Sequence, residues 1–309
     1  MRMKITALLA SAAMALSACA TMPTDGAETT VASLGPAATL ERVDGEGPAL
    51  WKVADEDTTI YMFGTIHILP ANMQWSNVRI SDALTSSDSI VTELMPGAAS
   101  TPESQQMFMS GGMLSDGRTL RSLMSDDERA RYEAALGKIG LPAAAFDQMK
   151  PWLAAITLSI VPLMQNGYDI ESGVEEALEK MASQETKRDA LETVEYQFNV
   201  FDGMPEETQL RYLLETADQV DNIKSYVDSM VAEWLEGDAD ALADMMNEGL
   251  EDPVLAERLL YTRNKNWAEW IDNRLDQPGT VFMAVGAGHL AGEKSVQDYL
   301  VDMDIATVR

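Results

Sequence analysis

The chain contains two histidines, and each of them closes a glycine-containing motif that directly follows a run of β-forming residues. His67 ends the motif GTIH after the run 59–63, and His289 ends the motif GAGH after the run 280–285. Glycine lets the backbone turn sharply and approach another group closely. Imidazole is both the commonest metal ligand and a general base near neutral pH. The repeated context favours one shared site over two unrelated turn histidines.

Glu93 is the carboxylate expected beside them, because it lies near the carboxyl end of an apolar run. Two imidazoles and one carboxylate, here His67, His289 and Glu93, suffice to bind a catalytic divalent metal ion with one open position. Water bound to such an ion is acidified and can attack a carbonyl group. Mixed nitrogen and oxygen ligands suit zinc, manganese, iron or cobalt alike.

A second interpretation of these three residues needs no metal. One histidine acts as a general base with Glu93 as its orienting group, or Glu93 is itself the base. A third interpretation places Glu93 in a surface salt bridge.

Arg263 is the other candidate catalytic residue, together with Glu93. Its neighbours at −4, −3, +4 and +7 on an expected helix over 253–275 are all apolar, so Arg263 should point inward. A buried guanidinium requires an acidic partner. That partner is a carboxylate of the site, a carboxylate of the substrate, or a structural acid elsewhere.

The residues around each motif predict the same order of elements: a strand, the GxxH turn, a helix and a second strand. The expected elements are strands 49–53, 59–63 and 89–94 with helix 77–84, and strands 280–285 and 304–308 with helix 293–303. The fold class expected is α/β (α+β), with a central, mostly parallel sheet built from these N- and C-terminal units. Because ligands bind at the carboxyl ends of parallel strands, the two histidines can converge there.

The middle of the chain, about 100–275, is expected to be a large helical insertion. Apolar residues fill 151–166 and predict a buried helix, which Pro162 should kink. An apolar stripe at helical spacing predicts one helix over 206–236, which Gly237 ends. A stripe this regular indicates packing against a core.

The N-terminus has the features of a processing signal. Arg2 and Lys4 precede an apolar stretch over 5–16 that is too short to span a bilayer. The sequence LSAC, which ends at Cys19, is similar to the bacterial lipobox, and Cys19 is the only cysteine. An ordinary secretory signal that ends in cysteine is the alternative. We therefore expect a lipoprotein signal peptide over 1–18, lipidation at Cys19, a flexible tether over 19–48 and a single domain over 49–309.

The formal charge is −28, from 22 basic and 50 acidic residues. Such a balance argues against a nucleic-acid partner, because phosphate backbones bind basic surfaces. Residue 20 is alanine rather than aspartate, a pattern that resembles sorting to the bacterial outer membrane. We expect a cell-envelope protein that is lipid-anchored at the outer membrane and faces the periplasm.

Several short motifs together resemble the TraB/GumN family, which includes the Tiki proteins. In chain order they are LWKV at 50–53, FGTIH at 63–67, EL at 93–94, KPW at 150–152, GYD at 167–169, GV at 173–174, LET at 191–193, Arg263-Asn264 with Trp267, and VGAGHL at 285–290. The resemblance covers about 48–309. Glu175 stands where many relatives have aspartate, and Met95 where a further acid is expected.

The resemblance implies a fold shared with the erythromycin-esterase-like and ChaN-like proteins. It also implies metal-dependent proteolysis, as in the Tiki proteins, with His67, His289 and Glu93 as the family's site residues. We expect a metal-dependent, peptidase-like hydrolase that acts on an unknown peptide or small molecule. The alternatives are a lipoprotein that binds metal or haem without catalysis, and an interaction protein with a degenerate site.

Overall fold

The computed structural model describes residues 47–248 and 252–309. The expected signal peptide, Cys19 and nearly all of the expected tether lie outside these residues. Within the described ranges no helix is long and apolar enough to cross a membrane.

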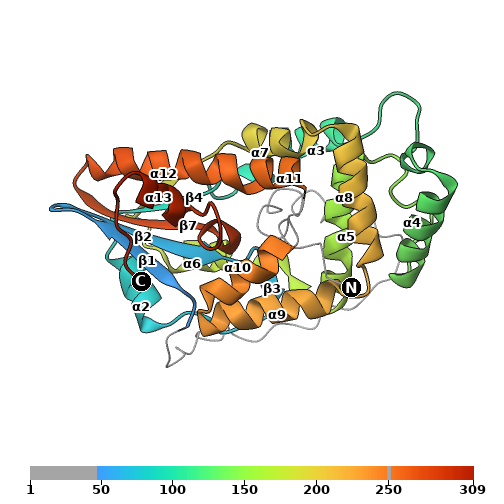
Figure 1. Cartoon of the computed structure of the whole chain (residues 1–309). Coiled ribbons are helices and arrows are strands. Elements are labelled where there is room, and N and C mark those ends of the chain that lie inside the picture. The colour runs from blue at the N-terminus through green and yellow to red at the C-terminus, as the bar shows by residue number, and fades with distance from the viewer. Residues whose placement is uncertain (1–46, 249–251) are drawn as a thin grey trace.

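A five-stranded sheet forms the centre of one half of the molecule, in the order β1-β2-β7-β4-β6 (Figure 1). Its strands are β1 (Leu50–Ala54), β2 (Thr58–Thr65), β4 (Ser89–Thr92), β6 (Lys187–Ala190) and β7 (Gly279–Gly286). β1 pairs antiparallel with β2, and the other neighbouring strands are parallel. The expected mixed α/β fold with a mostly parallel sheet is confirmed.

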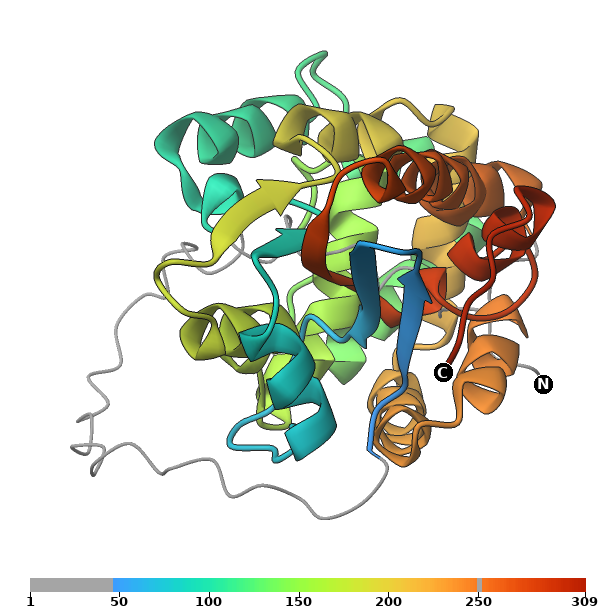
Figure 2. The ribbon, with the colours of Figure 1, turned by 90° about the vertical axis from the view of Figure 1, so that its left-hand side faces the viewer.

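Both faces of the sheet are covered, which explains why β7 is a continuous apolar run rather than an alternating one. On one face α12 (Thr262–Leu275) and α13 (Val296–Asp302) pack on the side chains of β2 and β7. On the opposite face lie α2 (Val78–Thr85) and α6 (Val174–Met181), as Figure 2 shows. The sheet is thus sandwiched between helices near its centre.

Helices make up the other half of the molecule (Figure 1). They are α3 (Pro102–Gly111), α4 (Asp126–Lys138), α5 (Pro151–Gln165), α7 (Val194–Asp202), α8 (Glu206–Asp218), α9 (Ile223–Glu236) and α10 (Ala239–Glu248). Nearly every side chain of α5 is buried, and α8 and α9 pack against it, while α4 packs on α8. The apolar stretch at 151–166 therefore forms the expected buried helix.

The expected helical insertion over about 100–275 also contains the strand β6, which joins the main sheet from inside this region. Its sequence is KRDA, and its side chains are partly or fully exposed because it is an edge strand. Edge strands commonly carry charges that discourage pairing with other chains. Apolar alternation was therefore missing, and the strand could not be recognised from periodicity.

Two expectations require correction. The stripe over 206–236 belongs to two helices, α8 and α9, because a turn at 219–222 interrupts it. The apolar spacing resumes after the turn, so periodicity alone did not indicate the break. The expected last strand at 304–308 forms only one antiparallel bridge, between Val308 and Lys52. Within the described residues the C-terminal unit therefore lacks its second parallel strand.

Candidate functional site

One ionisable side chain lies just beyond the carboxyl end of each of the four parallel strands. His67 follows β2, Glu93 follows β4, Glu192 follows β6 and His289 follows β7, each within three residues of the strand end. Because Gly64 pairs with Val285 and Thr65 with Gly286 across the β2–β7 ladder, the two GxxH motifs begin within one residue of the same level of the sheet. The structure thus brings the three expected site residues to one edge of the sheet and adds Glu192.

The two glycine motifs pack backbone against backbone. A Cβ placed on Gly64 would lie 3.0 Å from Cα of Ala287, so a larger residue at position 64 would push the motifs apart. The carbonyl of Gly64 accepts a hydrogen bond from Trp234 Nε1 at 2.8 Å, which fixes the turn before His67. Glycine in these motifs therefore permits the close approach that the repeated sequence context suggested.

Arg263 lies at the centre of a buried ion cluster, with 1% of its surface exposed. Its Nη2 donates to Glu93 Oε2 at 2.6 Å and to Glu192 Oε2 at 2.9 Å, and its Nε donates to Glu192 Oε1 at 2.8 Å. The bidentate geometry toward Glu192 is the strongest form of such a pair. The expectation that Arg263 is buried and paired with an acid is confirmed, and both partners belong to the same strand edge.

The backbone before Arg263 departs from a regular α-helix. A π-helical turn at Glu257–Tyr261 connects α11 (Pro253–Ala256) to α12, and such turns occur frequently at functional sites. Nη1 of Arg263 donates to the carbonyl of Leu259 in this turn at 3.1 Å. The indole of Trp267 lies 4.9 Å from Cζ of the guanidinium and donates to Glu192 at 3.1 Å. Arg263 is thus held on every side.

His289 is fully buried and bound at both ring nitrogens. Asn264 donates to the Lys294 carbonyl through Nδ2, so its Oδ1 is the acceptor for Nδ1–H of His289 at 2.6 Å. Nε2 is then the lone-pair nitrogen, and it lies 3.2 Å from Nη1 of Arg263 and 3.9 Å from Glu93 Oε1. Burial, the positive charge of Arg263, and the charge that His67 carries when it is protonated lower the pKa of His289 well below its ordinary value. His289 is therefore neutral.

His67 is paired with a different carboxylate, Glu175, in the first turn of α6. Nδ1 of His67 lies 2.5 Å from Glu175 Oε1, and Oγ1 of Thr65 donates to the same oxygen at 2.5 Å. Burial opposes ionisation of Glu175, but the charge of His67 in its protonated form and the hydrogen bonds with His67 and Thr65 outweigh burial. The pKa of Glu175 is therefore lowered, and the carboxylate is ionised beside the imidazole.

A pocket of about 140 Å³ gives access to this edge of the sheet. His67, Glu93, Glu175 and Gln197 contribute to its wall, and the segment 94–100 forms its apolar side. Arg263 and His289 do not line the pocket; they lie beside Glu93 on the side that faces away from it. The pocket therefore exposes one histidine and a set of carboxylates to a ligand.

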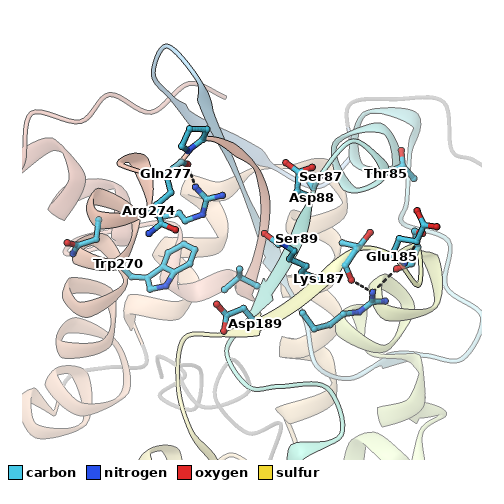
Figure 3. A pocket seen from close by; sticks show the side chains of 16 residues that line it. Thr85, Ser87, Asp88, Ser89, Glu185, Lys187, Asp189, Trp270, Arg274 and Gln277 are labelled. Carbon is cyan, nitrogen blue, oxygen red and sulfur yellow. Dashed lines mark hydrogen bonds between the residues drawn. The ribbon is translucent and has the colours of Figure 1, made fainter.

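A larger groove, of about 980 Å³, lies at the opposite, amino-terminal edge of the same strands. Figure 3 shows its floor at Ser89 and Lys187, with Trp270 and Arg274 of α12 on one side and Thr85 on the other. Neither histidine lines this groove. The smaller pocket is therefore the better candidate for the chemistry, despite its size.

The expected metal ligands do not fit a divalent ion as they are placed. A guanidinium nitrogen lies against Nε2 of His289 and another against Glu93, so the Arg263 cation lies where His289 and Glu93 would meet a metal. Within the part of the chain that the structure describes, no three His, Cys, Asp or Glu side chains form a group that could hold a metal ion. Binding a metal through His289 and Glu93 would require Arg263 to move away.

The fold and this edge of the sheet define an α/β protein with a site built from two GxxH turns, paired acids and a buried arginine. The model of the TraB/PrgY/gumN family matches residues 49–309. The chain therefore belongs to this family, and the resemblance of the motifs is confirmed. Comparisons with curated proteins and with solved structures give no match.

Several residues of the site had been noted in the sequence but given no firm role there. Glu175, Glu192 and Asn264 stand in the short motifs that resemble the family, whereas Gln197 has no motif to mark it. Glu192 follows an edge strand that periodicity does not reveal. Glu175 reaches His67 only because Gly173-Val174 packs on the GTIH turn. The backbone N–H of Val174 donates to the Ile66 carbonyl at 3.0 Å, so a backbone hydrogen bond joins the start of α6 to the GTIH turn.

Gly173→Ala should destabilise the protein by about 1–3 kcal/mol, as overpacking in a tight site commonly does. A Cβ at this position would fall well inside van der Waals contact with the carbonyl oxygen of His67. The matched control is Gly137→Ala in α4, where a Cβ meets nothing within 4 Å. The control should stabilise the helix by about 1 kcal/mol. Urea unfolding measures both; equal effects would show that position 173 tolerates a side chain.

Proposed function

We propose that the protein is a hydrolase of peptide, other amide or ester bonds, with His67 as the general base. The observation that carries this proposal is the His67–Glu175 pair at 2.5 Å on the wall of the pocket. A carboxylate on Nδ1 fixes the tautomer and the orientation of the ring and stabilises the imidazolium once it forms. Proton transfer then takes place at Nε2.

In the proposed reaction a water molecule in the pocket gives a proton to Nε2 of His67, and its oxygen attacks the substrate carbonyl carbon. The tetrahedral intermediate collapses, and the bond from that carbon to the leaving nitrogen or oxygen breaks. His67 returns the proton to the leaving group, so the products are a carboxylic acid and an amine or alcohol. General acid–base catalysis of this kind contributes about 10²–10⁴-fold to a rate.

The Arg263 cluster supports this chemistry from behind the pocket. Glu93 accepts hydrogen bonds from Arg263, from Gln197 at 3.0 Å and from the backbone N–H of Gly286 at 2.8 Å. These donors fix the carboxylate at the pocket wall in one orientation. Arg263 is thus a positioning residue in this proposal, and Glu93 is the member of the cluster that meets the substrate.

A second candidate is a metal-binding protein, with or without metal-dependent hydrolysis. The observation that favours it is that Nδ1 of each histidine is bound to an oxygen, of Glu175 or Asn264. Outer hydrogen bonds of this kind orient metal-bound imidazoles. Haem fits less well, because a 140 Å³ pocket with carboxylates is below the roughly 300–1,000 Å³ of ordinary small-molecule sites.

Metal analysis separates the two candidates. Purified protein and the variant with His67→Ala and His289→Ala are analysed for zinc, manganese, iron and cobalt, and hydrolysis of a peptide library is followed with and without EDTA. We expect hydrolysis to survive EDTA, because the Arg263 cation lies against the expected ligands. One ion per chain that the double variant loses, together with loss of hydrolysis in EDTA, would contradict the metal-free reaction and establish the second candidate.

We also propose that the protein is lipid-anchored outside the cytoplasm, at the outer membrane. The lipobox-like sequence before Cys19 supports this proposal. Cys19→Ser should abolish labelling by a fatty-acid probe and release the chain from the membrane fraction. The melting temperature of the folded domain should stay unchanged. Undiminished labelling of the variant would rule out lipidation at Cys19.

A further inference from the structure

The pocket beside His67 is lined by carboxylates without a lysine or arginine among the residues that form it. Three of its four acids have a cationic or titratable partner: Glu93 pairs with Arg263, Glu179 with Arg188, and Glu175 with His67. The fourth, Glu176, is exposed in the first turn of α6 and makes no ion pair within the described residues. An approaching ligand therefore meets an excess of negative charge.

Gln197 gives a second and independent indication of what binds. Its Nε2 donates to Glu93 at 3.0 Å and to Glu192 at 2.8 Å, and only an N–H₂ group can face two carboxylates. The amide orientation is therefore settled, and Oε1 must be an acceptor. This oxygen has no hydrogen-bond partner, although only 2% of the residue is exposed and Gln197 lines the pocket. Buried acceptors without a donor are rare in folded proteins and call for an explanation.

The remaining wall is apolar. Leu94, Met95 and Ala99 line one side, and Ile170 lies near the acids of α6. A ligand that satisfies both parts of the pocket combines an aliphatic stem with a nitrogen group that carries several N–H donors. A carboxylate or phosphate would instead meet like charge and a further acceptor.

We propose that the pocket recognises a cationic nitrogen group on an aliphatic stem, so that the substrate is a basic peptide. The group is an ammonium or guanidinium, supplied by a lysine or arginine side chain or by a free N-terminal amine. This inference deepens the proposed hydrolase function and rests on it in one respect: the peptide that binds in the pocket is also the substrate that is hydrolysed. The binding of the cation itself does not depend on turnover.

Four synthetic probes test the proposal by calorimetric titration of the purified protein. They are Ala-Xaa-Ala peptide amides with lysine, arginine or norleucine at the centre and an acetylated N-terminus, and the norleucine peptide with a free N-terminus. We expect at least one cationic probe to bind about three- to fivefold more tightly than acetylated norleucine, the range that one partly exposed ion pair supplies. The probe that gains identifies the source of the charge.

Matched variants separate the pocket from the general charge of the molecule. Glu176→Gln should remove most of the preference for the cationic probe. Glu269→Gln removes the same charge from the exposed side of α12, which covers the opposite face of the sheet, and should preserve the preference. Equal losses in the two variants would show that only the net charge of −28 attracts the probe and would overturn the proposal.

Binding and cleavage fail in distinguishable ways. Equal affinity of all four probes overturns the cationic pocket, and hydrolysis of neutral peptides would then leave the proposed function intact. Selective binding of a cationic probe, without cleavage of any library peptide that contains the preferred group, upholds the pocket and contradicts the hydrolase.

Discussion

Arg263→Ala should lower the free energy of unfolding by about 3–5 kcal/mol, the usual cost of removing one partner from a buried ion pair. The variant leaves Glu93 and Glu192 buried beside each other, with 7% of Glu93 exposed. Urea denaturation followed by circular dichroism measures this change. We expect Arg263→Lys to recover only part of the loss, because an ammonium cannot reproduce the two parallel bonds to Glu192.

An exposed arginine provides the comparison. Arg118 also makes two hydrogen bonds to one carboxylate, Glu206, but 44% of its side chain is exposed. Arg118→Ala should shift the urea midpoint far less than Arg263→Ala, since solvent screens exposed pairs. If the urea midpoint shifts by a similar amount in the two variants, Arg263 is not the buried counter-ion of Glu93 and Glu192.

His67→Gln should reduce the rate of hydrolysis by about 10²–10⁴-fold, because glutamine cannot accept the proton of the attacking water. Glu175→Gln should cause a smaller loss, since the imidazole remains but loses its orienting carboxylate. Both substitutions are close in size to the native side chains, so the urea midpoint should change little compared with that of Arg263→Ala. Initial rates on a library peptide that the native protein cleaves measure the effect.

Lys187→Gln is the control for these rates, because Lys187 lines the larger groove at the opposite edge of the sheet. Its rate should equal that of the native protein. Full activity of His67→Gln would exclude His67 as the base. A lower rate of hydrolysis in Lys187→Gln would indicate that the larger groove takes part in the reaction.

The elements that could be predicted from the sequence are those whose burial is two-sided or whose apolar face is regular. β7 and α5 are of this kind, since nearly all their side chains are buried. β6 is an edge strand with charged side chains, and its role as the fourth parallel strand depends on contacts with β4 that no local pattern records. The turn between α8 and α9 was hidden for a similar reason, because their apolar stripe continues across it.

The site residues that could be predicted from the sequence are those that a local motif or helical periodicity marks. The paired GxxH turns indicated His67 and His289, and helical phase indicated that Arg263 points inward. The partners of these residues depend on tertiary packing: Glu175 reaches His67 from α6, and Glu192 reaches Arg263 from β6. The expected joint metal set of His67, Glu93 and His289 is divided in the structure, because Arg263 takes Glu93 and His289 while Glu175 takes His67.

Hydrolysis in water enriched in oxygen-18 tests the central proposal most directly. A peptide library is incubated with the native protein or with His67→Gln, in the presence of EDTA, and new C-termini are identified by mass spectrometry. If His67 activates water, the native protein should produce cleavage products that carry one heavy oxygen in the new carboxyl group, and the variant should produce almost none. Products that appear equally with both proteins, or no products from the native protein, would contradict a hydrolase built on His67.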